Sequence, residues 1–132
     1  LQNPDAFALQ ASGFGSAQPG EIVTLWLSEV FSIFRDSFVN FPMIAVTFGS
    51  PLPTSSSKVE FLRQEISPGN TIAVIDSVDI LSGASQVIIK PDPRAIISSG
   101  QHKFFVRLQA NPDEPLHVQG FMFFVEVKPK KD

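Results

Sequence analysis

The chain has 132 residues, of which 43% are hydrophobic and 17% charged, with a net charge of −3 and no cysteine. This length suits one domain with a single hydrophobic core. The missing cysteines exclude a disulfide framework and a thiolate metal site, and the scattered Lys and Arg residues form no basic stripe for a nucleic-acid partner. No apolar run approaches the roughly 18 residues of a membrane-spanning helix.

The aromatic residues are 13 Phe and one Trp, with no Tyr. Phe contributes buried area without a hydrogen-bonding group, so most of these rings are predicted to pack in a core or against another subunit. A mean hydropathy of +0.14 is high for a small monomer, because a small body has too much surface to hide every apolar side chain. Part of this apolar surplus is therefore expected to form an interface.

Residues 1–16 are predicted to form an extended segment in front of the main domain. Phe7, Leu9 and Ala11 occupy alternate positions and would point to one side of a strand. The run from Ser12 to Ser16 contains two glycines and is typical of a hinge. The segment is either the first strand of its own domain, which is the favoured interpretation, or a donor strand that adds to the sheet of a neighbouring copy.

Apolar and β-branched residues predict strands at 21–27, 43–48 and 58–66. The first of these is apolar on both of its faces, so it is expected to be buried on both sides, with Trp26 as a core ring. The second precedes a loop at 49–57 that is rich in Pro and Ser. The third alternates more weakly and is expected to be half exposed.

Residues 28–40 fit two structures. Val30, Phe31, Phe34 and Phe38 recur at helical spacing, and Pro42 lies just beyond them, which favours a short amphipathic helix. The same stretch is rich in residues that prefer strands and also fits a period of two. The spacing gives the helix a narrow preference.

Four further strands are predicted at 71–81, 86–90, 102–110 and 116–128. The first two are joined by a short turn, and the last two are expected to form a long hairpin closed at 111–115. The final strand, with Phe121 and Phe123, is the most apolar in the chain and would invite aggregation if it lay at an exposed edge. Residues 129–132 are expected to form a polar tail.

Many short strands separated by turn signals predict an all-β, two-sheet β-sandwich over residues 17–128, either immunoglobulin-like or a jelly roll, with room for one short helix near 28–40. The segments from Pro19 to Leu25 and from Gly100 to Val106 resemble the B and F strand openings of immunoglobulin-like domains, without their paired cysteines. This resemblance implies an architecture and no function.

No residues in the sequence predict catalysis, and no metal or cofactor is expected. His102 and His117 would lie at opposite ends of the final hairpin, which indicates one surface histidine at each strand end. Asp76 and Asp79 would face opposite sides of a strand. The sequence also lacks a Gly-x-Ser-x-Gly nucleophile elbow.

These observations favour a non-enzymatic structural subunit that self-assembles into an extracellular filament, capsid or other surface assembly through β-strand and hydrophobic contacts. The predicted interface has Phe7, Leu9 and Ala11 as inserting residues, and Phe121 and Phe123 as the acceptor face or core. The expected partner is a second copy of the chain, in an oligomer or polymer.

The alternative is a carbohydrate- or protein-binding module that uses the loops at 49–57 and 91–100. The expected location is extracellular, at a cell surface or in a virion. Because the chain begins at Leu1 and not at Met, removal of an export signal is one interpretation, and a fragment of a longer protein is the other.

Overall fold

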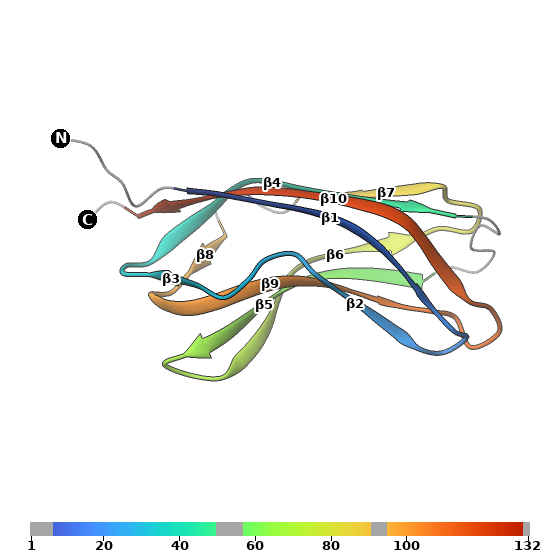
Figure 1. The fold of residues 1–132 in the computed structure, drawn as a ribbon, viewed down its shortest axis with the longest axis horizontal. Coiled ribbons are helices and arrows are strands. Elements are labelled where there is room, and N and C mark those ends of the chain that lie inside the picture. Colours follow the sequence, from blue (N-terminus) through green and yellow to red (C-terminus); the bar gives the residue numbers. More distant parts are fainter. Residues whose placement is uncertain (1–6, 50–56, 91–94, 131–132) are drawn as a thin grey trace.

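The computed structural model describes residues 7–49, 57–90 and 95–130, and confirms the predicted all-β sandwich. Ten strands of this part of the chain form two antiparallel sheets that face each other (Figure 1). The described residues contain no helix, and so none that is long and apolar enough to cross a membrane. The strands are β1 (Phe7–Ala17), β2 (Ile22–Trp26), β3 (Phe31–Ile33), β4 (Ser37–Phe48), β5 (Ser57–Ser67), β6 (Thr71–Ile80), β7 (Gln86–Ile89), β8 (Ile96–Ile97), β9 (Gly100–Gln109) and β10 (Leu116–Pro129).

The strand order is that of a jelly roll. Sheet A has the order β1-β10-β4-β7, with β8 beside β4, and sheet B has the order β2-β9-β5-β6, with β3 beside β9. Three pairs of successive strands stay in one sheet: β2 and β3, the β5-β6 hairpin, and β7 and β8. Every other connection carries the chain to the opposite sheet, as in double-sheet jelly rolls.

The likeness of β2 and β9 to immunoglobulin strands does not extend to their placement. Strands B and F of an immunoglobulin-like domain lie in different sheets. Here β2 and β9 are antiparallel neighbours in sheet B, with Val23 opposite Leu108 and Trp26 opposite Phe105. Of the two predicted sandwich types, the strand order therefore supports the jelly roll.

The helix predicted at 28–40 is wrong. Residues Phe31–Ile33 form β3 against β9, and Ser37–Phe48 form β4, whose first two residues pair with β8. Ile33 and Val39 are buried, whereas Phe34 is 91% exposed. A helix would have placed Phe34 on the buried face, so the strand preference of the residues and the available ladder partners outweigh the helical spacing.

The predicted long hairpin is also wrong. β9 lies in sheet B and β10 in sheet A, so the turn at 111–115 connects the two sheets. The turn between β6 and β7 likewise connects the sheets. As a result β10 lies between β1 and β4, and β1, not the apolar final strand, forms one edge of sheet A. β10 reaches Pro129, and the Lys130 backbone N–H donates to the Asp36 carbonyl oxygen over 2.8 Å.

The core fills the space between the sheets. Its central rings are Phe61 and Phe104 from sheet B and Phe123 from sheet A, with ring centroids 5.4 to 6.1 Å apart. All three are buried. Tilted and edge-to-face aromatic packing of this kind adds to the gain from apolar burial.

The outer face of β2 is open to solvent, which corrects two expectations. Val23 and Leu25 are buried, but Ile22 and Thr24 are exposed and Trp26 is 50% exposed. Trp26 is therefore not a core ring. An antiparallel sheet packed on one side only leaves alternate residues in water, even where those residues are apolar.

One glycine carries a strict backbone requirement. Gly100 has φ +136°, and a Cβ there would overlap the Ser67 carbonyl oxygen. A Cβ at Gly120 would meet the Gly13 carbonyl oxygen at 3.8 Å, which is ordinary contact.

We expect Gly100→Ala to lower the free energy of unfolding by about 2 kcal/mol or more, because both backbone strain and steric overlap oppose the methyl group. Gly120→Ala is the matched control, with an expected change below about 0.5 kcal/mol. Urea denaturation of both variants checks this, and equal effects would contradict the assigned strain at Gly100.

Candidate functional site

The five residues predicted to form an interface come together along β1 and β10 of the same chain. Leu9 lies opposite Val125, and Ala11 lies opposite Phe123. Phe121 and Phe123 are buried in the core, while Phe7, Leu9 and Ala11 are partly buried and pack against it. Whether β1 also pairs with a neighbouring copy remains a prediction.

The glycine-containing segment predicted as a hinge is part of β1. The strand continues to Ala17 with an irregularity between Gly13 and Gly15. A Cβ at Gly13 would lie 2.8 Å from Cε1 of Phe121, which is closer than a real Cβ approaches. Gly13 therefore allows β1 to close over the Phe121 ring.

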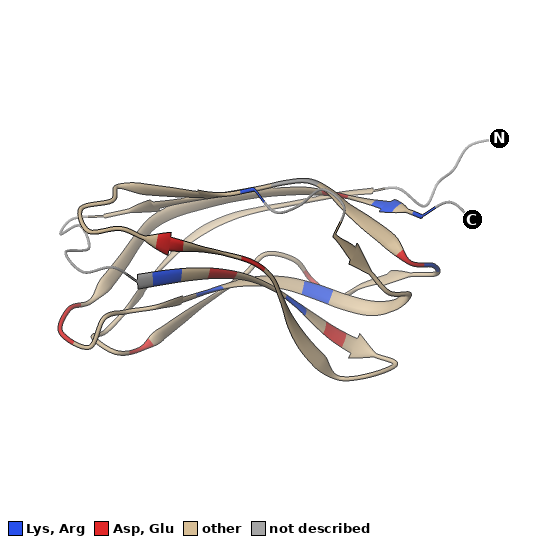
Figure 2. Cartoon of the chain, turned by 180° about the vertical axis from the view of Figure 1, so that it is seen from behind, with Lys and Arg blue, Asp and Glu red and all other residues tan. Residues whose placement is uncertain are grey.

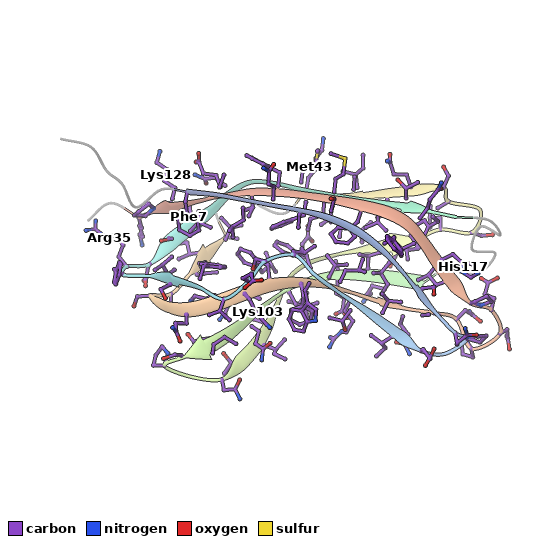
Figure 3. All side chains as sticks on the ribbon, viewed as in Figure 1. Phe7, Arg35, Met43, Lys103, His117 and Lys128 are labelled. Carbon is purple, nitrogen blue, oxygen red and sulfur yellow. The ribbon has the colours of Figure 1, made fainter. Side chains whose placement is uncertain are left out.

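The central part of the outer side of sheet A is apolar, and it was not among the residues predicted to form an interface. One cross-strand row runs from Ser12 through Met122 and Ala45 to Ile88, and a second runs from Gln10 through Phe124 to Met43. Figure 3 shows Met43 standing on the side of sheet A that points away from sheet B. We call this surface the apolar face; it consists of Phe14, Met43, Ala45, Ile88, Met122 and Phe124.

A signal for this face was present in β10. Met122 and Phe124 alternate with Phe121, Phe123 and Val125, so the strand is apolar on both sides. In an antiparallel sheet with one buried face, the other face is normally polar. A strand that is apolar on both faces is therefore a candidate for a second contact surface.

Charge is distributed unequally between the two sheets. β1, β4, β7 and β8 contain no charged residue, and β10 contains only Glu126 and Lys128, near its end. In Figure 2, the coloured charged segments of sheet A are sparse, and those of sheet B are more frequent. The strands of sheet B contain Lys58, Glu60, Arg63, Glu65, Asp76, Asp79, Lys103 and Arg107.

The apolar face contains a hollow of about 500 Å³. Both methionines of the chain line it, and their flexible thioether side chains can adapt to an inserted group. We call it the methionine hollow; its lining residues are Gln10, Ala11, Ser12, Met43, Met122, Phe123 and Phe124.

A smaller aromatic cluster lies on the outer side of sheet B. The Trp26 and Phe105 ring centroids are 5.0 Å apart, and the Lys103 Nζ lies 3.9 Å from the Trp26 ring centroid. Leu62 lies opposite Phe105 in the pairing of β5 with β9 and is fully buried. Lys103 therefore occupies one face of the exposed Trp26 ring.

The two histidines lie in different sheets, and His102 is not at the surface. It is fully buried on the inner side of β9, where it alternates with Phe104 and Val106. Its Nε2–H donates to the Ser98 carbonyl oxygen over 2.6 Å, and its Nδ1 has no hydrogen-bond partner. His117 is half-buried at the start of β10. Among the described residues, no three His, Asp or Glu side chains gather as a metal site would require.

Burial lowers the pKa of the His102 imidazole below its ordinary value of 6.5. The Ser98 carbonyl opposes this effect, the positive charge of Arg63 adds to it, and the negative charge of Glu65 opposes it. Protonation would place a charge on an Nδ1 that has no acceptor, so the neutral ring is the form that fits the fold.

No family model matches the sequence, and no curated protein matches it. Among solved structures, a chain of infectious bursal disease virus, Gx strain, aligns with a TM-score of 0.50 and 10% identity over 91% of this chain. This chain spans 31% of that longer viral chain. The crystal structure of FLHE aligns with a TM-score of 0.48 and 12% identity, covering 93% of this chain and 97% of that one. The decameric BFDV capsid protein aligns with a TM-score of 0.44 and 8% identity, covering 96% and 98%. At these identities the likeness concerns the fold alone.

The protonation state of His102 predicts a pH dependence of stability. Because the folded-state pKa lies below the unfolded value, the folded protein binds fewer protons, and His102 contributes stability above pH 6.5 that is lost as the pH falls. Between pH 7.5 and 5, the wild type should therefore lose more unfolding free energy than His102→Gln, as measured by urea denaturation. A pH slope unchanged in His102→Gln would contradict the assignment.

Proposed function

We propose that this chain is a non-enzymatic structural subunit that self-associates into a capsid, filament or other surface assembly. The observation that carries the proposal is the apolar face on a sandwich whose core is already complete. Soluble monomers rarely expose contiguous apolar patches of more than a few hundred Å². The exposed part of this face includes Phe14, Met43 and Met122.

The edge of sheet A adds a second support for association. β1 has 11 residues and contains neither charged residues nor Pro. Natural edge strands usually carry such residues, because an unprotected edge pairs with other chains. β1 therefore offers backbone groups at the rim of the same sheet that presents the apolar face.

Fold likeness gives weaker support. Jelly rolls occur in viral capsid domains and also in lectins, so the fold by itself does not select a function. The likeness to a chain of infectious bursal disease virus agrees with a particle-forming role and extends only to the fold. A location outside the cell, at a surface or in a virion, is part of the proposal.

Assembly predicts a solution mass that rises with protein concentration. By light scattering, the mass should exceed the 14.4 kDa of one chain and grow on concentration. Because the apolar face carries no charge, raising the salt concentration should not dissociate the assembly. A constant mass of 14.4 kDa over the whole range would contradict the proposed function.

The donor-strand hypothesis concerns how β1 takes part. Phe7, Leu9 and Ala11 would make in a neighbouring copy the contacts that β1 makes with its own β10, as in domain swapping. The chain lacks cysteine, so Ala8→Cys with Glu126→Cys introduces one reporter pair at opposed positions.

If β1 is exchanged, oxidation of this double variant yields disulfide-linked dimers or larger species on a non-reducing gel. Disulfides formed only within single chains, in a sample that is assembled by light scattering, would contradict strand exchange. Each single-cysteine variant serves as the control for random cross-linking.

A binding module is the second candidate function, and the exposure of Trp26 favours it. Aromatic side chains at half exposure often contact ligands. Residues 50–56 of the loop predicted at 49–57, and residues 91–94 of the loop predicted at 91–100, lie outside the described residues. A constant monomeric mass, which would contradict assembly, would make the outer side of sheet B the surface to examine for ligands.

A further inference from the structure

Phe14 is the most exposed residue of the apolar face, and its two neighbours determine its direction. A Cβ on Gly13 would point at the Phe121 ring, and a Cβ on Gly15 would point at Leu25. Both directions lead into the core, so Phe14 between them points outward. Its side chain is 81% exposed.

Phe14 and the methionine hollow lie on the same side of the same sheet. Ser12, two residues before Phe14 in β1, lines the hollow, and Met122 is its cross-strand neighbour. A cleft of about 500 Å³ falls in the size range of sites that hold small organic groups. The apolar face thus carries both a protruding ring and an apolar recess.

From this pairing we infer that two copies of the chain pack face to face through sheet A, with Phe14 of each copy inserted into the methionine hollow of the other. A two-fold interface requires a surface that is complementary to itself, so that residue i contacts residue j and j contacts i. The two-fold axis that relates the two copies lies in the plane of the interface, between Phe14 and the methionine hollow. This inference rests on the proposed function and specifies its first contact.

The low charge and the area of sheet A both favour a second copy of the chain as the partner that covers the apolar face. Four of the five strands of sheet A carry no charge, so self-pairing buries no unpaired ion there. With strands about 4.8 Å apart and residues about 3.3 Å long, four strands of the length of β1 give the whole outer side of sheet A roughly 700 Å², and the apolar face is the central part of it. A standard interface buries about 800 Å² on each partner. The charged sheet B of each copy stays in water.

Phe14→Ser tests the inserted ring, and Phe34→Ser is the matched control. Phe34 is as exposed as Phe14 but lies in the connection between β3 and β4, away from the apolar face. By sedimentation over a concentration series, Phe14→Ser should weaken dimer formation roughly 100-fold, since two anchors are lost per dimer. Phe34→Ser should leave it unchanged. Thermal unfolding at a concentration where both are monomeric confirms that each variant is folded.

A mixing experiment distinguishes reciprocal insertion from general adhesion. Met122→Glu should block the hollow and also abolish the dimer. The Phe14→Ser variant keeps an intact methionine hollow, and the Met122→Glu variant keeps its Phe14 ring. When the two variants are mixed, the Phe14 ring of the Met122→Glu variant can insert into the hollow of the Phe14→Ser variant, which restores one of the two contacts. The mixture should therefore form more dimer than either variant alone.

The outcomes separate this inference from the proposed function. If the wild type is monomeric throughout, both fail. If it associates but Phe14→Ser and Phe34→Ser behave alike, or the mixture dimerises no better than its components, the reciprocal interface is wrong and the proposed function stands.

Discussion

The structure depends on the packing of aromatic rings between the two sheets. Phe61, Phe104 and Phe123 join sheet B to sheet A with centroids 5.4 to 6.1 Å apart. Once Phe123 points inward, strand alternation fixes the outward direction of its neighbours Met122 and Phe124. The core contact therefore determines which apolar residues of β10 lie on the outer side of sheet A, and those residues belong to the apolar face.

The asymmetry between the sheets connects the core to the proposed function. Both sheets bury their inner residues, so the core alone does not explain why sheet A has only Glu126 and Lys128 as charged residues in its strands. Sheet B carries a Glu60–Arg107 ion pair with a 3.2 Å contact and other charged side chains that suit water. Such partly exposed pairs contribute little stability but keep a surface solvated. Sheet A lacks this solvation over most of its area, as expected of a contact surface.

The sequence allowed the strands and the sandwich to be predicted, because alternation and turn residues act locally. It could not show that the turn at 111–115 changes sheets, since a hairpin and a crossover use similar short loops. At 28–40 the hydrophobic residues fit both periods, and only the partners β8 and β9 decide between them. The sequence also could not show whether Trp26 points into the core or out to solvent, because both faces of its strand are apolar. For the candidate site, the sequence predicted residues of β1 and β10 but not Phe14 or the methionines.

The two methionines of the chain, Met43 and Met122, both lie on the apolar face, and so they report its burial directly. The decisive measurement is their rate of oxidation by dilute peroxide, followed by peptide mass spectrometry, at a low concentration and at one where the mass has risen. Thioether oxidation requires access to the sulfur. If the face is the contact surface, both rates fall together on assembly. Unchanged rates in an assembled sample would show that the chain associates through another surface.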